Sequence, residues 1–80
     1  MYWVYILKSR DYQKSYIGYT DNVERRLQEH NSGRTAFTKK YKPWEVIHRE
    51  SFTNITDAIQ REKFLKSRSG RRFLKSVIFV

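Results

Sequence analysis

The run Tyr2-Trp3-Val4-Tyr5-Ile6-Leu7 constrains the fold more than any other segment of the chain. It is β-branched and aromatic, without alternation of polar and apolar residues, which is typical of a strand covered on both faces. We therefore expect a central strand with other elements packed on either side. The run is far shorter than the roughly 20 apolar residues that span a bilayer, and it lacks the features of a signal peptide. We expect a soluble, cytoplasmic protein.

Two further strands are predicted. Ser15 to Thr20 reads as the second strand of a hairpin, and Trp44 to Phe52 as a third strand. In that third strand we expect Trp44, Val46 and Phe52 on one face and Ile47 on the other. Gly18 lies inside the second strand, which indicates either a bulge or a close approach by a ligand or another backbone.

Helices fill most of the remaining chain. One is expected from Asp21 to Asn31, with Asp21 as its cap and Glu24 in capping-box spacing. The basic stretch from Arg34 to Pro43 reads as an ordered or half-ordered loop that faces a partner. Asn54 is expected to cap a second helix, from Ile55 to about Ser67, which Ser69-Gly70 breaks. Its predicted apolar stripe consists of Ile55, Ala58, Ile59 and Leu65, and a last short helix or turn returns Phe73, Leu74, Val77 and Ile78 to the core.

The order strand, strand, helix, strand, helix, helix predicts an α+β fold, in which a three-stranded antiparallel sheet is flanked by helices. A chain of 80 residues has material for one hydrophobic core, so residues 1–80 are expected to form a single domain. There are no cysteines, which removes disulfides and thiol chemistry and is compatible with a reducing cytosol.

The net charge of the chain indicates what kind of partner it binds. The chain has 17 Lys and Arg against 8 Asp and Glu, a formal net charge of +9, which favours a polyanion such as nucleic acid. A solubilising surface is the plain alternative. The residues expected to contact nucleic acid backbone are Arg34, Lys39, Lys40, Arg68, Arg71 and Arg72, and Gly18 is expected to let the ligand approach.

Three polar residues occupy positions that helical periodicity reserves for the core. Val23, Arg26, Leu27 and His30 follow i, i+3, i+4, i+7 spacing, so Arg26 and His30 should face inward. Glu62 shares the spacing of Ile55 and Ile59 and should point toward the sheet. An internal Arg26–Glu62 ion pair with a hydrogen-bonded His30 would explain these positions structurally. The functional interpretation is a cleft in which Arg26 holds phosphate and Glu62 holds a divalent metal ion.

Tyr5 and Tyr16 lie on neighbouring predicted strands, close to Gly18. Each could be an ordinary core tyrosine with a satisfied hydroxyl group. Beside cations or a metal ion, however, a phenol can orient a water molecule or take its proton. His48, by contrast, reads as an ordinary strand residue.

These residues resemble the GIY-YIG nuclease domain, and the chain is similar to the small stand-alone proteins related to the amino-terminal nuclease domain of excinuclease C. The second half of the naming motif stands intact as Tyr16-Ile17-Gly18, whereas the first half reads Trp3-Val4-Tyr5 and keeps only its tyrosine. The rest of the match comprises the segments from Asn22 to Asn31 and from Ala58 to Lys66.

The resemblance implies a one-metal phosphodiesterase. In it, Tyr16 or Tyr5 would assist the attacking water, Arg26 would stabilise charge on the phosphate, and His30 would support proton transfer or position a tyrosine. Glu62 would be the sole protein ligand of one Mg²⁺ or Mn²⁺ ion. Some relatives carry a lysine where this chain has Tyr19, which leaves room for a weak activity.

The resulting hypothesis is a metal-dependent DNA endonuclease that selects structure rather than sequence, with a role in DNA repair or recombination. RNA remains open as a substrate. The alternatives are a noncatalytic nucleic-acid-binding module of the same fold and an adaptor that docks a protein partner through its charged patches.

Overall fold

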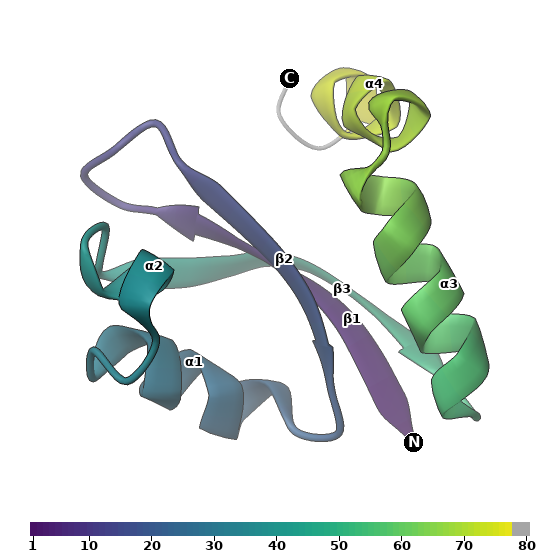
Figure 1. Ribbon diagram of the computed structural model, residues 1–80, viewed down its shortest axis with the longest axis horizontal. Helices are drawn as coiled ribbons and strands as arrows, with labels where there is room; N and C mark the ends of the chain where they lie inside the picture. Colours follow the sequence, from purple (N-terminus) through teal and green to yellow (C-terminus); the bar gives the residue numbers. More distant parts are fainter. Residues whose placement is uncertain (78–80) are drawn as a thin grey trace.

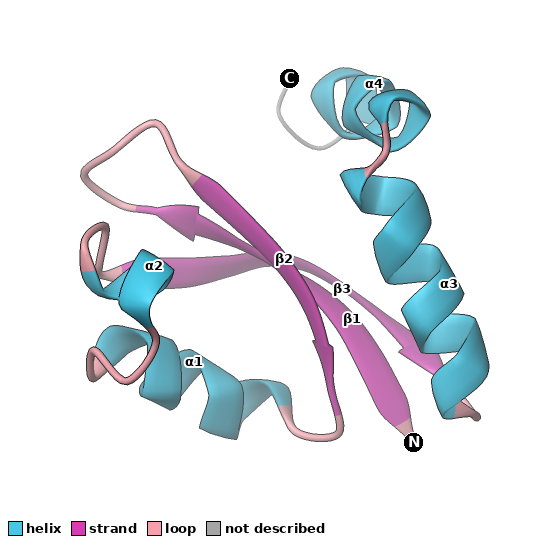
Figure 2. Ribbon diagram, in the orientation of Figure 1, coloured by secondary structure: helices cyan, strands magenta, loops and turns pink. Residues whose placement is uncertain are grey.

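The computed structural model describes residues 1–77, and its centre is a three-stranded antiparallel sheet (Figures 1 and 2). Strands β1 (Tyr2–Ser9), β2 (Ser15–Thr20) and β3 (Trp44–Phe52) are arranged in the order β2-β1-β3. The predicted α+β class and the central position of the first strand are thus confirmed. Tyr5 in the middle of β1 pairs with Gly18 of β2 on one side and with Arg49 of β3 on the other.

Helices cover the sheet on both sides (Figure 1). Helices α1 (Val23–Asn31) and α2 (Ala36–Lys39) lie on one side, and α3 (Ile55–Lys66) and α4 (Arg68–Val77) lie on the other. Alternate residues of β1 supply the two halves of the core. One half joins Val4 and Ile6 to Ala58, Leu65 and Leu74, and the other joins Tyr5 and Leu7 to Val23 and Trp44. Burial of both faces explains why the β1 sequence shows no polar alternation.

The first helix begins later than its sequence predicts. Asn22 is the N-cap, because its side-chain oxygen accepts the backbone N–H of Arg25 at 3.0 Å. Asp21, the predicted cap, lies one residue outside and forms an ion pair with Arg25 at 2.8 Å. Both Asp and Asn cap well, so local preference alone does not choose between neighbours.

The third strand contains an irregularity that overturns its predicted faces. The pairing with β1 shifts between Ile6 and Leu7, so Ile6 lies opposite His48 while Leu7 lies opposite Val46. Ile47 is the extra residue, and a bulge of this kind reverses the alternation beyond it. Trp44 and Val46 consequently pack with Tyr5, whereas Phe52 packs against the opposite half of the core.

Within the predicted basic loop, residues Ala36–Lys39 form the short helix α2, which the sequence pattern did not predict. The structure confirms Asn54 as the cap of α3, where it accepts the Asp57 N–H at 2.9 Å. The predicted stripe of α3 is only partly right, because Ala58 and Leu65 are buried but Ile55 is 41% exposed.

The end of α3 lies at Ser67, and the predicted breaker Gly70 lies inside α4. Gly70 is needed there for packing, because a Cβ atom at this position would overlap the backbone of Phe64 and Leu65. Leu74 is buried and Phe73 packs beside it, as predicted. The Val77 side chain and Ile78, also expected in the core, lie outside the described residues. No helix in residues 1–77 is long and apolar enough to span a bilayer.

Candidate active site

A buried hydrogen bond joins the central strand to the first helix. Tyr5 is 1% exposed and His30 is fully buried, and the Tyr5 hydroxyl lies 3.0 Å from His30 Nε2. The packing of Val23 and Leu27 against the half of the core around Tyr5 places the last turn of α1 next to the phenol. The predicted inward orientation of His30 is therefore observed.

Two threonines satisfy the other ring nitrogen of His30. Its Nδ1 lies 2.9 Å from the Thr38 hydroxyl and 3.1 Å from the Thr35 hydroxyl. Thr38 is fully buried, and its carbonyl accepts the indole N–H of Trp44 at 2.8 Å. Sequence reasoning did not assign these threonines to the site. The sequence did contain one signal for them. Thr35 and Thr38 are three residues apart in an otherwise basic segment, which is the spacing of neighbours on one face of a helix.

Tyr16 lies beside this pair and is half-buried. Its ring centroid is 4.6 Å from that of His30 and 6.2 Å from that of Tyr5. Gly18 makes this arrangement possible, because a Cβ there would lie 2.8 Å from the Tyr5 hydroxyl oxygen and 3.0 Å from the Tyr16 ring. The groups that approach Gly18 closely are thus two phenol side chains, whereas the sequence suggested a bulge, a ligand or another backbone. A contact between Gly18 and nucleic acid stays a prediction.

Arg26 lies one turn before His30 on α1, with its side chain 27% exposed. Its guanidinium forms a short ion pair with Glu29 and lies close enough to Tyr5 to lower that residue's pKa. The internal ion pair between Arg26 and Glu62, which the sequence left open, does not form among residues 1–77. Arg26 instead pairs with Glu29, and Glu62 pairs with Lys66.

Glu62 approaches from α3, with its side chain 17% exposed and its Oε1 atom 3.5 Å from Lys66 Nζ. Burial is the main cause of the raised pKa of Tyr5, and the negative charge of Glu62 adds a smaller contribution in the same direction. Residues 1–77 contain no cluster of three or more His, Cys, Asp or Glu side chains that could coordinate a metal ion together. A single carboxylate fits magnesium, which keeps several waters and shares its site with substrate phosphate. It does not fit a structural zinc site.

Burial keeps both members of the hydrogen-bonded pair neutral. It raises the pKa of Tyr5 to about 12, although Arg26 partly opposes this effect. It lowers the pKa of His30 to about 4, and the positive charge of Arg26 lowers it further. The hydrogen bond with Glu29 raises the pKa of Arg26. Near neutral pH the site therefore contains a neutral phenol, a neutral imidazole and a permanent cation.

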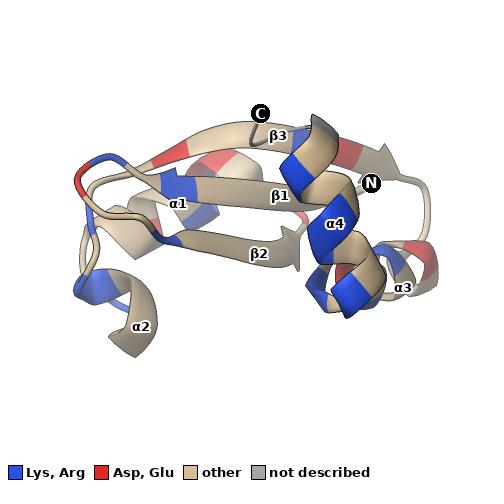
Figure 3. Ribbon diagram, turned by 90° about the horizontal axis from the view of Figure 1, so that it is seen from above, with Lys and Arg blue, Asp and Glu red and all other residues tan. Residues whose placement is uncertain are grey.

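The residues expected to bind nucleic acid backbone divide into two groups. Lys39 ends α2 and Arg34 and Lys40 lie beside it, whereas Arg68, Arg71 and Arg72 lie on α4, where basic positions are dense (Figure 3). All six are exposed. His48 lies in β3 with its Nε2 2.9 Å from Glu50, whose carboxylate also binds Arg61.

The fold is an α+β domain whose candidate site combines a buried tyrosine–histidine pair with a second tyrosine, an arginine and a carboxylate. Comparison with known proteins identifies the family that has this fold. A family model described as the GIY-YIG catalytic domain matches residues 1–75. The chain belongs to the GIY-YIG catalytic-domain family, which is a nuclease family. The predicted resemblance is thus confirmed.

Similar proteins cover nearly the whole chain. A UPF0213 protein of Oceanobacillus iheyensis is 40% identical over 98% of this chain and 91% of its own length. Another, from Natronomonas pharaonis, is 44% identical over 85% of this chain and 80% of its own. The solution NMR structure of a UPF0213 protein from Bacillus halodurans has a TM-score of 0.56 and 32% identity, covering 95% of this chain and 83% of that one.

Proposed function

We propose that the protein is a divalent-metal-dependent endonuclease that hydrolyses phosphodiester bonds in DNA, selects structure rather than sequence, and serves repair or recombination. The observation that carries the proposal is the convergence of Tyr16 with the buried Tyr5–His30 pair within hydrogen-bonding or ring-contact distance, beside Arg26, whose charge acts on the pKa values of both members of that pair. A purely structural core has no need for this many polar groups in one place.

Each side chain has a defined task in this proposal. Tyr16 is the accessible phenol, so it orients the water that attacks the phosphorus atom. Tyr5 is buried and bonded to His30 at 3.0 Å, so this pair forms a rigid support for the Tyr16 ring. Arg26 keeps its positive charge at all relevant pH values and stabilises the negative charge that develops on the phosphate.

Glu62 would hold the Mg²⁺ or Mn²⁺ ion. When bound, such an ion acts as a Lewis acid that neutralises charge on the phosphoryl oxygens. In the free protein, Lys66 Nζ lies 3.5 Å from Glu62 Oε1 and partly offsets the negative charge of the carboxylate.

Selection of structure follows from the kinds of contact that the chain offers. Its exposed cations can bind phosphates, which position a protein on DNA but carry no sequence information. A noncatalytic binding module is the second candidate, and the position of Lys66 favours it, because its positive charge lies 3.5 Å from the carboxylate that a metal ion would need.

The substitution Glu62→Gln separates the two candidates. Cleavage of labelled single-stranded, duplex, flap and junction DNA would be measured with magnesium, manganese or EDTA. We expect metal-dependent cutting by the wild-type protein and its loss in Glu62→Gln, with DNA affinity equal or higher. The matched control is Glu45→Gln, because Glu45 is exposed and pairs only with Arg10 among residues 1–77. If the wild-type protein binds every substrate but cleaves none of them with either metal, the endonuclease proposal is contradicted and the noncatalytic module is supported.

A further inference from the structure

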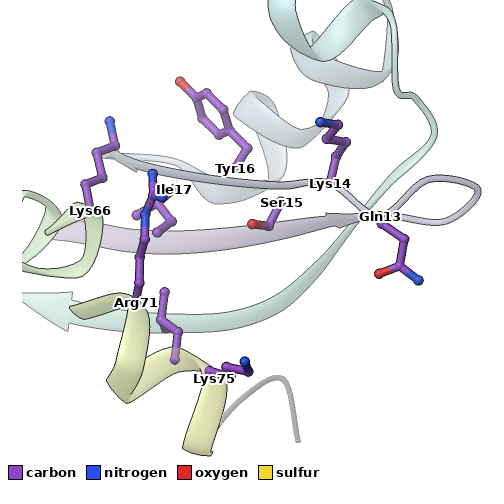
Figure 4. A pocket seen from close by; sticks show the side chains of 9 residues that line it. Gln13, Lys14, Ser15, Tyr16, Ile17, Lys66, Arg71 and Lys75 are labelled. Atoms are coloured by element: carbon purple, nitrogen blue, oxygen red, sulfur yellow. The ribbon is translucent and has the colours of Figure 1, made fainter. Parts of the chain in front are cut away.

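A groove of about 660 Å³ runs between the start of β2 and helix α4 (Figure 4). Ile17 and Leu74 form its apolar floor, and both also belong to the core on that side of the sheet. The floor of the groove is therefore part of the folded core, and Leu74 anchors α4 beside it.

Cations line this groove without any acid. Its charged lining residues are Lys14, Lys66, Arg71 and Lys75, and all four are exposed. Lys66 lies 3.5 Å from Glu62, while the other three have no acidic partner within 4.0 Å in the described part of the chain. Like charges held together repel one another. A polyanion that enters the groove would relieve this repulsion and displace bound counterions.

The groove borders the candidate active site at the edge strand β2, where the Tyr16 ring points to the opposite face of the sheet from Ile17 (Figure 4). Tyr16 lines it and also lies 4.6 Å from His30 between ring centroids. Lys66 lines it and lies beside Glu62. On α4, Arg71 and Lys75 are four residues apart and therefore project from the same face of the helix. One row of positive charge thus extends from the site along α4.

A second hollow in the described part of the chain has a different lining. It lies beside α1 and contains Glu29 together with Arg25 and Arg34. Arg25 is already paired with Asp21 at 2.8 Å. Of these two hollows, the groove between β2 and α4 has more cations without an acidic partner.

We propose that this groove binds the sugar–phosphate backbone of a DNA strand next to the phosphodiester bond that is cut, with the scissile phosphate at Tyr16. The position of the cut rests on the proposed function, but the binding does not. Lys14, Lys66 and Lys75 thereby join Arg71 as backbone contacts, and the strand leaves the site along α4 rather than across α2.

Fluorescence anisotropy with labelled flap DNA in EDTA tests the groove without any cleavage. Arg71→Glu and Lys75→Glu should each lower affinity about tenfold or more and reduce the slope of log affinity against log salt by about 1. The milder Lys75→Gln should show a smaller loss in the same direction. The matched control is Arg10→Glu, because Arg10 is exposed, lies outside both the groove and the basic stretch from Arg34 to Pro43, and changes the net charge equally.

Equal losses in Lys75→Glu and Arg10→Glu would overturn the groove as the DNA-binding site, because net charge alone would then explain both losses. DNA affinity equal to that of the wild-type protein in both Arg71→Glu and Lys75→Glu would also overturn the proposed binding groove. Circular dichroism melts establish that each variant is folded. In a cleavage assay the groove variants should need more DNA than the wild-type protein to reach half-saturation. If the protein binds DNA through the groove but cleaves none of the substrates, the proposed nuclease activity is refuted and the proposed binding groove is supported.

Discussion

The Tyr5 hydroxyl and the His30 imidazole stabilise each other as neutral groups inside the fold. Their hydrogen bond of 3.0 Å is continued by Thr38 and Thr35 at the far side of the imidazole. A buried network of this kind is valuable only when every member is satisfied, and no buried side-chain nitrogen or oxygen in the described residues lacks a partner.

Thr38 is the residue whose loss tests this network. Thr38→Val removes the hydroxyl at 2.9 Å from His30 Nδ1 while keeping the shape of the side chain. The free energy of unfolding should fall by about 1 kcal/mol or somewhat more, since a buried acceptor or donor loses its better partner. Urea denaturation measures the change. Thr38→Ser keeps the hydroxyl and should keep most of the stability, so equal losses in the two variants would assign the effect to packing instead.

The low pKa of His30 predicts an acid-dependent loss of stability. In the folded protein the pKa is about 4, against an ordinary value of 6.5, so between these pH values the unfolded chain binds more protons. Stability is therefore fully present above pH 6.5 and decreases as the pH falls toward 4, by about 3 kcal/mol in total. Urea titrations across this range measure it. His48→Gln should keep this dependence, and its loss in that variant would contradict the assignment to His30.

At the scale of elements, the sequence predicted the parts that local signals define. The apolar run of β1 predicted a strand buried on both faces, and Asn54 predicted the start of α3. The bulge at Ile47 and the packing role of Gly70 were not predicted, because each depends on contacts between elements that are distant in sequence. The inward positions of His30 and Glu62 followed from helical periodicity.

Gly70 provides a test of how α4 docks on α3. A Cβ atom at Gly70 would overlap backbone atoms of Phe64 and Leu65, which cannot rotate away. Gly70→Ala should therefore destabilise the protein by about 1–3 kcal/mol, although alanine favours helices. The neighbouring change Ser69→Ala is the control and should be nearly neutral. Thermal melts compare the two, and a Gly70→Ala protein as stable as wild type would show that α4 does not pack as described.

At the scale of the whole molecule, the sheet brings together groups that the chain supplies from separate elements. Tyr5 and Tyr16 come from β1 and β2, Arg26 and His30 from α1, and Glu62 from α3. Periodicity indicated which of these point inward. Their mutual distances, and the participation of α2 through its threonines, required the tertiary structure.

The most direct test of this account is the single-turnover rate of DNA cleavage by Tyr16→Phe compared with wild type, in magnesium and at saturating protein. Removing the hydroxyl that orients the attacking water should slow cleavage about 100-fold or more, while DNA affinity and thermal stability stay close to those of wild type because the ring remains. Cleavage by Tyr16→Phe at the wild-type rate would contradict the central claim that this tyrosine, beside the buried Tyr5–His30 pair, is catalytic.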